Sequence, residues 1–94
     1  MEQHLSQYKI FYEVARCGNI SRAAKELYIS QPAISKAISK LEESLGIKLF
    51  SRNSRGVQLT REGAILFQHV NTAFDSIGRG ERELKRIHDF HIGN

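Results

Sequence analysis

The stretch between residues 30 and 40 combines small, hydroxyl-bearing and basic side chains at helical spacing. On a helical wheel, Pro32, Lys36 and Ser39 lie opposite an apolar stripe. The small or polar residues that flank them are Ala33, Ser35 and Lys40. Hydroxyl and ammonium groups can bond to base edges and phosphate oxygens, and the first turn of a helix offers backbone N–H groups to phosphate. The pattern predicts a helix that enters the major groove of duplex DNA.

Gln31 lies in the first turn of this helix, where a long amide side chain reaches adenine or a phosphate. We therefore interpret it as a DNA contact and not as a solvated polar residue. For Ser35 and Ser39 both interpretations stay open, because an exposed helical serine often faces only water.

Positive charge is concentrated around the same helix. The chain has 94 residues and a net charge of +4. Residues 31–61 include six basic and two acidic residues, whereas the rest of the chain carries eight of each. The basic residues are Lys36, Lys40, Lys48, Arg52, Arg55 and Arg61, and the acidic ones are Glu42 and Glu43. This distribution is typical of a surface that binds a polyanion, although charge alone does not distinguish it from a solvated basic face.

Two helices are predicted before residue 30, because apolar residues recur there every three or four positions. The first spans about Leu5 to Cys17 and is ended by Gly18. The second is short, and Ser21 is expected to cap it. Its inward residues are Ala23, Ala24 and Leu27.

The third helix is the best specified. Ser30 is expected to cap it, Pro32 occupies its first turn, and Gly46 ends it. Its inward stripe consists of Ile34, Ile38, Leu41 and Leu45.

A β-hairpin and a fourth helix follow. Residues 48–52 and 57–59 are short extended segments around a turn-rich group, and Thr60 caps the helix that comes next. A coiled-coil-like seam on this helix, interrupted by Glu81, is expected to extend beyond the core and therefore predicts a dimer interface. The seam consists of Phe67, Val70, Phe74, Ile77 and Leu84. The glycines at 78 and 80 are expected to loosen the helix, and residues 88–94 are expected to fray.

From about Leu5 to Leu84, the chain resembles the LysR-type transcriptional regulators of bacteria in one unbroken register. The resemblance rests on the segments SRAAKEL (21–27), ISQPAISK (29–36), LEESLG (41–46), LFSR (49–52), RGVQLT (55–60) and EG (62–63). It implies a mainly α fold, a winged helix-turn-helix with a three-helix core and a β-hairpin wing, followed by a long linker helix that dimerises.

On this resemblance, residues 1–60 form the DNA-binding domain, with the helix-turn-helix at 20–39 and the wing at 48–59, and residues 61–94 form the linker helix and tail. The implied DNA contacts are Ser21, Ser30, Gln31, Pro32, Ala33, Ser35, Lys36, Ser39 and Lys40, with Arg52 and Arg55 on the wing. Lys36 departs from the arginine that the family often has, and lysine reads guanine less rigidly.

The resemblance also implies the partners. The first is double-stranded DNA that contains an interrupted inverted repeat. The second is another copy of the chain, which pairs through the linker helix, and the full-length protein could assemble further into a tetramer. An effector would be bound by a C-terminal domain outside these 94 residues.

No enzyme, cofactor or metal site is expected. No nucleophile–base pair or carboxylate pair can be placed on one surface, and His88 and His91 have no third ligand at matching spacing. Cys17 is the only cysteine, so an intramolecular disulfide is excluded. No apolar run approaches the roughly 20 residues of a membrane helix, and the N-terminus does not resemble a signal peptide, so we expect a cytoplasmic protein.

The alternative function is a protein-interaction module that uses a winged helix without binding DNA. An interaction face would be expected to carry aromatic or large apolar residues, whereas residues 30–40 present a slim polar face. The sequence therefore favours DNA.

Overall fold

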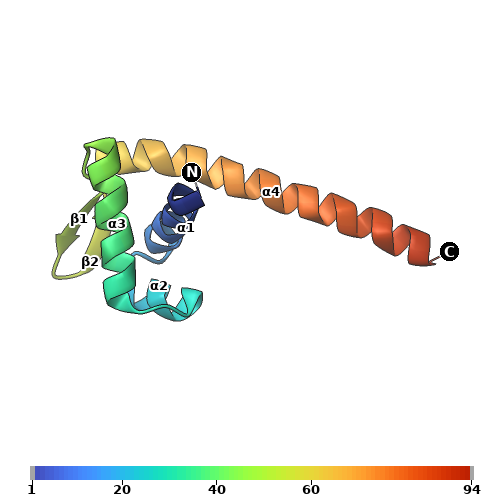
Figure 1. The fold of residues 1–94 in the computed structure, drawn as a ribbon, viewed down its shortest axis with the longest axis horizontal. Coiled ribbons are helices and arrows are strands. Elements are labelled where there is room, and N and C mark those ends of the chain that lie inside the picture. Colours follow the sequence, from blue (N-terminus) through green and yellow to red (C-terminus); the bar gives the residue numbers. More distant parts are fainter. Residues whose placement is uncertain (1, 94) are drawn as a thin grey trace.

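The computed structural model describes the backbone of residues 2–93 and the side chains of residues 5–89. A small helical body carries a β-hairpin on one side and a long helix that extends away from it (Figure 1). The elements are α1 (Glu2–Cys17), α2 (Ile20–Leu27), α3 (Gln31–Leu45), β1 (Phe50–Asn53), β2 (Gly56–Leu59) and α4 (Arg61–Gly93). The principal extents are 55 × 24 × 24 Å, so the molecule is elongated along α4.

The core lies where α1, α2 and α3 meet the start of the hairpin. Its largest fully buried side chains are Phe11, Val14, Ile34, Leu41 and Leu49. The predicted inward positions Ala23, Ala24, Ile34, Ile38 and Leu41 are confirmed, and Leu27 is partly buried against this core. The small residues of α2 allow the neighbouring helices to approach closely.

Leu45 was predicted to face inward, and this is wrong, because 44% of it is exposed. It lies in the last turn of α3, immediately before the left-handed Gly46 (φ 70°), where the chain leaves the helix and turns toward β1. The predicted caps of α3 are confirmed. The backbone N–H of Ala33 donates to Ser30 Oγ at 3.2 Å, and Gly46 ends the helix.

The predicted cap of α2 is also wrong. Gly18 has a left-handed backbone (φ 67°) and leaves Asn19 extended, which is the conformation that a capping residue requires. The N–H of Arg22 donates to Asn19 Oδ1 at 3.0 Å, so α2 begins at Ile20 and Ser21 already lies in its first turn.

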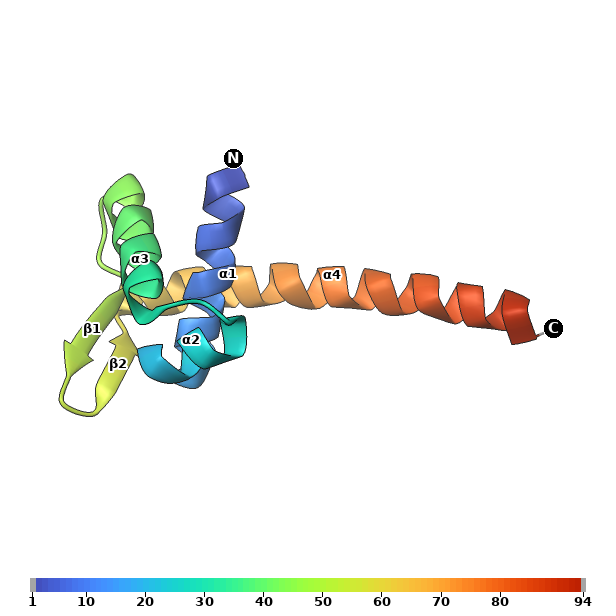
Figure 2. The same ribbon diagram turned by 60° about the horizontal axis from the view of Figure 1, so that its bottom comes forward.

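The hairpin is confirmed, with Phe50 opposite Leu59 and Asn53 opposite Gly56. Figure 2 shows it beside α2 and the lower end of α3. A Cβ on Gly56 would lie 2.7 Å from the carbonyl oxygen of Gly18, and the φ of Gly56 is 126°. Glycine is therefore required at residue 56, where the hairpin packs against the turn between α1 and α2.

Helix α4 is continuous from Arg61 to Gly93, so the prediction of a frayed tail is wrong for the described backbone. The helix also continues through the glycines at 78 and 80, and their loosening effect stays a prediction. A helical glycine costs only about 1 kcal/mol relative to alanine. An ion pair between Arg79 and Asp75 (3.4 Å) supports the helix where the glycines occur, and residues 81–87 are mostly good helix formers.

Three of the five residues of the predicted α4 seam face the body. Val70 is 7% exposed and belongs to the core, while Phe67 and Phe74 contact Tyr12 of α1, with ring centroids 5.7 and 5.1 Å apart. The expectation that Val70 and Phe74 lie beyond the reach of the core is therefore wrong, because α1 crosses the early turns of α4 and packs Tyr12 against them (Figure 2). Ile77 and Leu84 remain well exposed, as predicted.

Candidate nucleic-acid interface

Helix α3 presents the predicted polar face. Gln31, Pro32, Ala33, Lys36, Ser39 and Lys40 are exposed, and Ser35 is half-buried. Opposite them, Ile34, Ile38 and Leu41 are buried against α1 and the hairpin start. The apolar stripe thus sets the rotation of α3 and directs the polar face outward.

The first turn of α3 offers fewer backbone donors than expected. Pro32 has no N–H, and the N–H of Ala33 is already bonded to Ser30 Oγ. In this turn the N–H of Gln31 can still donate a hydrogen bond to an anion. Phosphate binding would therefore depend more on side chains than on the end of the helix.

The wing lies next to α3 across an open cleft of about 360 Å³, lined in part by Ser39, Glu42, Lys48 and Arg52. Arg52 is on β1 and Arg55 is at the tip of the hairpin, and both are exposed. At this tip the N–H of Arg55 donates to Asn53 Oδ1 at 2.8 Å, which closes the turn. The predicted residues of α3 and of the wing therefore share one continuous side of the molecule, while Ser21 is half-buried on α2.

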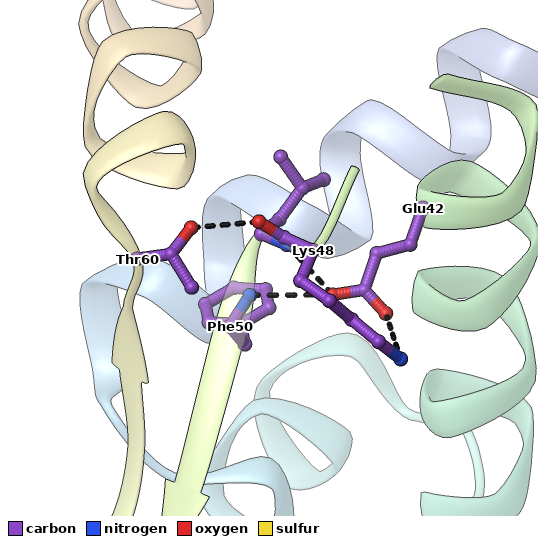
Figure 3. Close-up of polar contacts among 5 residues, drawn as sticks. Glu42, Lys48, Phe50 and Thr60 are labelled. Carbon is purple, nitrogen blue, oxygen red and sulfur yellow. Dashed lines mark hydrogen bonds and ion pairs between the residues drawn. The ribbon is translucent and has the colours of Figure 1, made fainter. Parts of the chain in front are cut away.

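Glu42 is a positioning residue that the sequence analysis did not identify. It is only 9% exposed, and its Oε2 accepts hydrogen bonds from the N–H groups of Leu49 (2.8 Å) and Phe50 (3.2 Å) (Figure 3). The ammonium group of Lys48 lies 3.7 Å from Oε1. One carboxylate on α3 thus fixes the beginning of β1. The available signal was its position four residues after the buried Ile38, on the edge of the apolar stripe.

Thr60 joins the other strand to α4. Its hydroxyl accepts from the N–H of Gly63 (3.0 Å), which confirms the predicted cap, and donates to the carbonyl of Lys48 (2.7 Å) (Figure 3). Its own N–H donates to the carbonyl of Leu49 at 2.9 Å. The segment at residues 48–50 is therefore held by α3 on one side and by the start of α4 on the other.

The basic charge of this side is largely free. Among the side chains of residues 5–89, Lys48 is the only one of the six basic residues between 31 and 61 that forms an ion pair. The surface around α3 and the wing therefore attracts anions.

Other sites receive no support within the described part of the chain. The described residues contain no group of three or more histidine, cysteine or acidic side chains that could hold a metal ion, and the side chain of His91 lies outside them. None of the described helices is both long and apolar enough to cross a membrane. Cys17 is a half-buried free thiol.

Comparison with known proteins agrees with this geometry. Residues 5–64 match the family described as "Bacterial regulatory helix-turn-helix protein, lysR family". The chain is 42% identical over 80 residues to the uncharacterized HTH-type transcriptional regulator y4mQ of Sinorhizobium fredii, covering 85% of this chain and 27% of that protein. It is 31% identical over 93 residues to the HTH-type transcriptional regulator CrgA of Neisseria meningitidis, covering 99% of this chain and 31% of CrgA. The chain thus spans between a quarter and a third of the length of these relatives.

Two similar solved structures contain DNA. The BenM DBD in a complex with catB site 1 DNA has a TM-score of 0.79 and 35% identity, covering 88% of this chain and 93% of that one. The CbnR DBD in a DNA complex has a TM-score of 0.74 and 34% identity, covering 93% of this chain and 98% of that one. Because the matched region includes α2, α3, the wing and the start of α4, this chain belongs to the lysR family of bacterial regulatory helix-turn-helix proteins.

Proposed function

We propose that this chain is the sequence-specific DNA-binding part of a transcriptional regulator, with α3 in the major groove and the wing on the backbone or in the minor groove. The observation that carries the proposal is the slim polar face of α3, which lies beside Arg52 and Arg55 on one unpaired basic surface. The DNA complexes of the two structurally similar domains support it. A protein-interaction module is disfavoured, because the exposed residues of α3 from Gln31 to Lys40 include no large apolar side chain.

The finer features of the proposal follow the family. Residues 1–60 bind DNA, residues 61–94 link two copies into a homodimer, and the dimer recognises an interrupted inverted repeat. A C-terminal domain outside these residues binds an effector and modulates transcription. Selection of bound sequences from random duplex DNA tests this directly, since a dimer should enrich two related half-sites in inverted orientation.

The base-reading role of α3 predicts a loss of discrimination when its polar side chains are removed. Gln31→Ala and Ser35→Ala should each reduce the preference for the selected operator over random DNA, by about 1–3 kcal/mol for each lost base contact. Gln68→Ala and Ser44→Ala remove similar groups from other exposed positions and should leave the preference unchanged. Wild-type discrimination in both α3 variants would refute the assignment of α3.

The wing arginines are expected to act through phosphates, because they lie on and at the tip of a hairpin. Arg52→Gln and Arg55→Gln should weaken binding to operator and random DNA alike, and should flatten the plot of log affinity against log salt by about one unit per lost contact. Arg79→Gln removes the same charge from α4 and is the control. A changed base preference with an unchanged salt slope would contradict the phosphate role.

A further inference from the structure

The turn between α2 and α3 carries an exposed aromatic side chain that is not among the predicted DNA contacts. Tyr28 follows the last residue of α2 and is 94% exposed, so its ring adds almost no buried surface to the core. The backbone alone ties the residue to the body. The N–H of Tyr28 donates to the carbonyls of Ala24 and Lys25, and the N–H of Ile29 donates to the carbonyl of Ala24 at 3.1 Å. The fold therefore uses the backbone at residue 28 but not the side chain.

The backbone conformation of Tyr28 is unfavourable for a tyrosine. Its φ and ψ are 59° and 40°, and among the described residues it is the only one other than glycine with a positive φ. Glycine or asparagine is favoured at the left-handed position that ends a helix, because a Cβ there crowds the backbone. A costly conformation at an exposed position indicates that the side chain serves a function.

Tyr28 also lies beside the part of α3 that is proposed to enter the groove. It precedes Ser30, the cap of α3, by two residues and Gln31 by three. In Figures 1 and 2, the turn that contains Tyr28 lies on one side of the beginning of α3, and the wing lies on the other. The major groove is about 12 Å wide, and a phosphate backbone borders it on each side. With the beginning of α3 in the groove, the wing and this turn therefore face opposite backbones.

We propose that the hydroxyl of Tyr28 donates a hydrogen bond to a phosphate on the side of the groove opposite the wing. Tyrosine is one of the side chains that make such contacts, which position a protein on DNA without reading its sequence. The donor is neutral, so the contact releases no counterion, in contrast to the contacts expected of Arg52 and Arg55. The inference rests on the proposed DNA binding and adds a positioning residue to it.

Removal of the hydroxyl tests the contact. Tyr28→Phe should weaken binding to the selected operator and to random duplex DNA by about fivefold each. The slope of log affinity against log salt should keep its wild-type value, which distinguishes this contact from those of the wing arginines. Tyr8→Phe removes the same hydroxyl from α1, where Tyr8 packs against the core, and should leave DNA binding unchanged.

Neutral phosphate analogues locate the contact. Single methylphosphonate groups placed along the operator should weaken wild-type binding at several positions. At one position in each half-site, the same replacement should have a much smaller effect on Tyr28→Phe, because the hydrogen bond is already lost. Equal effects on the two proteins at every position would overturn the phosphate contact.

A stability measurement separates this role from a role in the fold. Tyr28→Gly relieves the left-handed strain and should raise the melting temperature by about 4 °C, while it weakens DNA binding at least as much as Tyr28→Phe. A Tyr28→Gly chain that melts below the wild type would show that the tyrosine serves the fold, and would overturn the inference.

The variants of α3 and of the wing distinguish failure of this inference from failure of the proposed function. Wild-type affinity of Tyr28→Phe, beside weakened Gln31→Ala and Arg52→Gln variants, would overturn the tyrosine contact alone. A wild-type chain that binds no duplex DNA would instead refute the proposed function, and the tyrosine contact with it.

Discussion

Replacing Gly63 with alanine should lower the free energy of unfolding by about 3 kcal/mol, at the upper end of what overpacking costs. A Cβ at this position would overlap the carbonyl oxygen of Leu49 and would lie 3.1 Å from a methyl group of Leu59. The oxygen belongs to the backbone segment that Glu42 and Thr60 also hold, so it cannot move without shifting the start of the wing. Urea denaturation measures the loss.

Gly78→Ala is the matched control, since it makes the same substitution in the same helix. Its new Cβ would meet only the flexible end of Arg82, at 3.3 Å, so the helix should gain up to about 1 kcal/mol. If Gly63→Ala were as stable in urea as the wild type or as Gly78→Ala, the close approach of α4 to residue 49 would not limit the fold.

Glu42→Ala should cost about 3 kcal/mol of stability, because the N–H groups of Leu49 and Phe50 lose a charged acceptor in a buried place. The start of β1 should then become mobile, and DNA affinity should fall with the wing contacts. Denaturation measures the first effect. The salt slope of DNA binding measures the second, since it should decrease as it does for Arg52→Gln.

Two variants separate this role from the loss of a charge. Glu42→Gln keeps one oxygen acceptor and should recover roughly half of the stability. Glu43→Ala removes a neighbouring exposed carboxylate and should change stability by no more than about 0.5 kcal/mol. Equal effects of Glu42→Ala and Glu43→Ala would show that the carboxylate of Glu42 does not hold the strand.

The helices and their ends were largely predictable from local chemistry. The period of apolar residues located the inward face of α3, and Ser30, Thr60 and Gly46 mark helix ends whose capping hydrogen bonds join residues close in the sequence. The cap of α2 was not predictable in this way, since Asn19 and Ser21 are both good caps. The choice between them depends on the left-handed backbone of Gly18, which leaves Asn19 extended and whose carbonyl accepts from the N–H of Val57 in the hairpin.

Contacts between distant elements could not be predicted from periodicity. The spacing of Phe67, Val70 and Phe74 indicates one face of α4 but not which surface covers it. That depends on how Gly63 sets α4 against the body and on how far α1 extends beside it. Glu42 was missed for a similar reason, because a carboxylate among lysines and arginines suggests a solvated charge until its partners in β1 are known.

Because α4 is continuous, a small rotation of the helix relative to the DNA-binding body produces a large displacement of its far end. About 28 Å of helix extends from Phe74 to Gly93, at 1.5 Å per residue. A rotation of about 10° near Phe74 moves the far end by about 5 Å, which exceeds the spacing of about 3.4 Å between successive bases on one strand. If two copies pair as proposed, the angle between α4 and the body would therefore set the separation of the two α3 helices, and the helix assignment shows no break at the glycines that would interrupt this coupling.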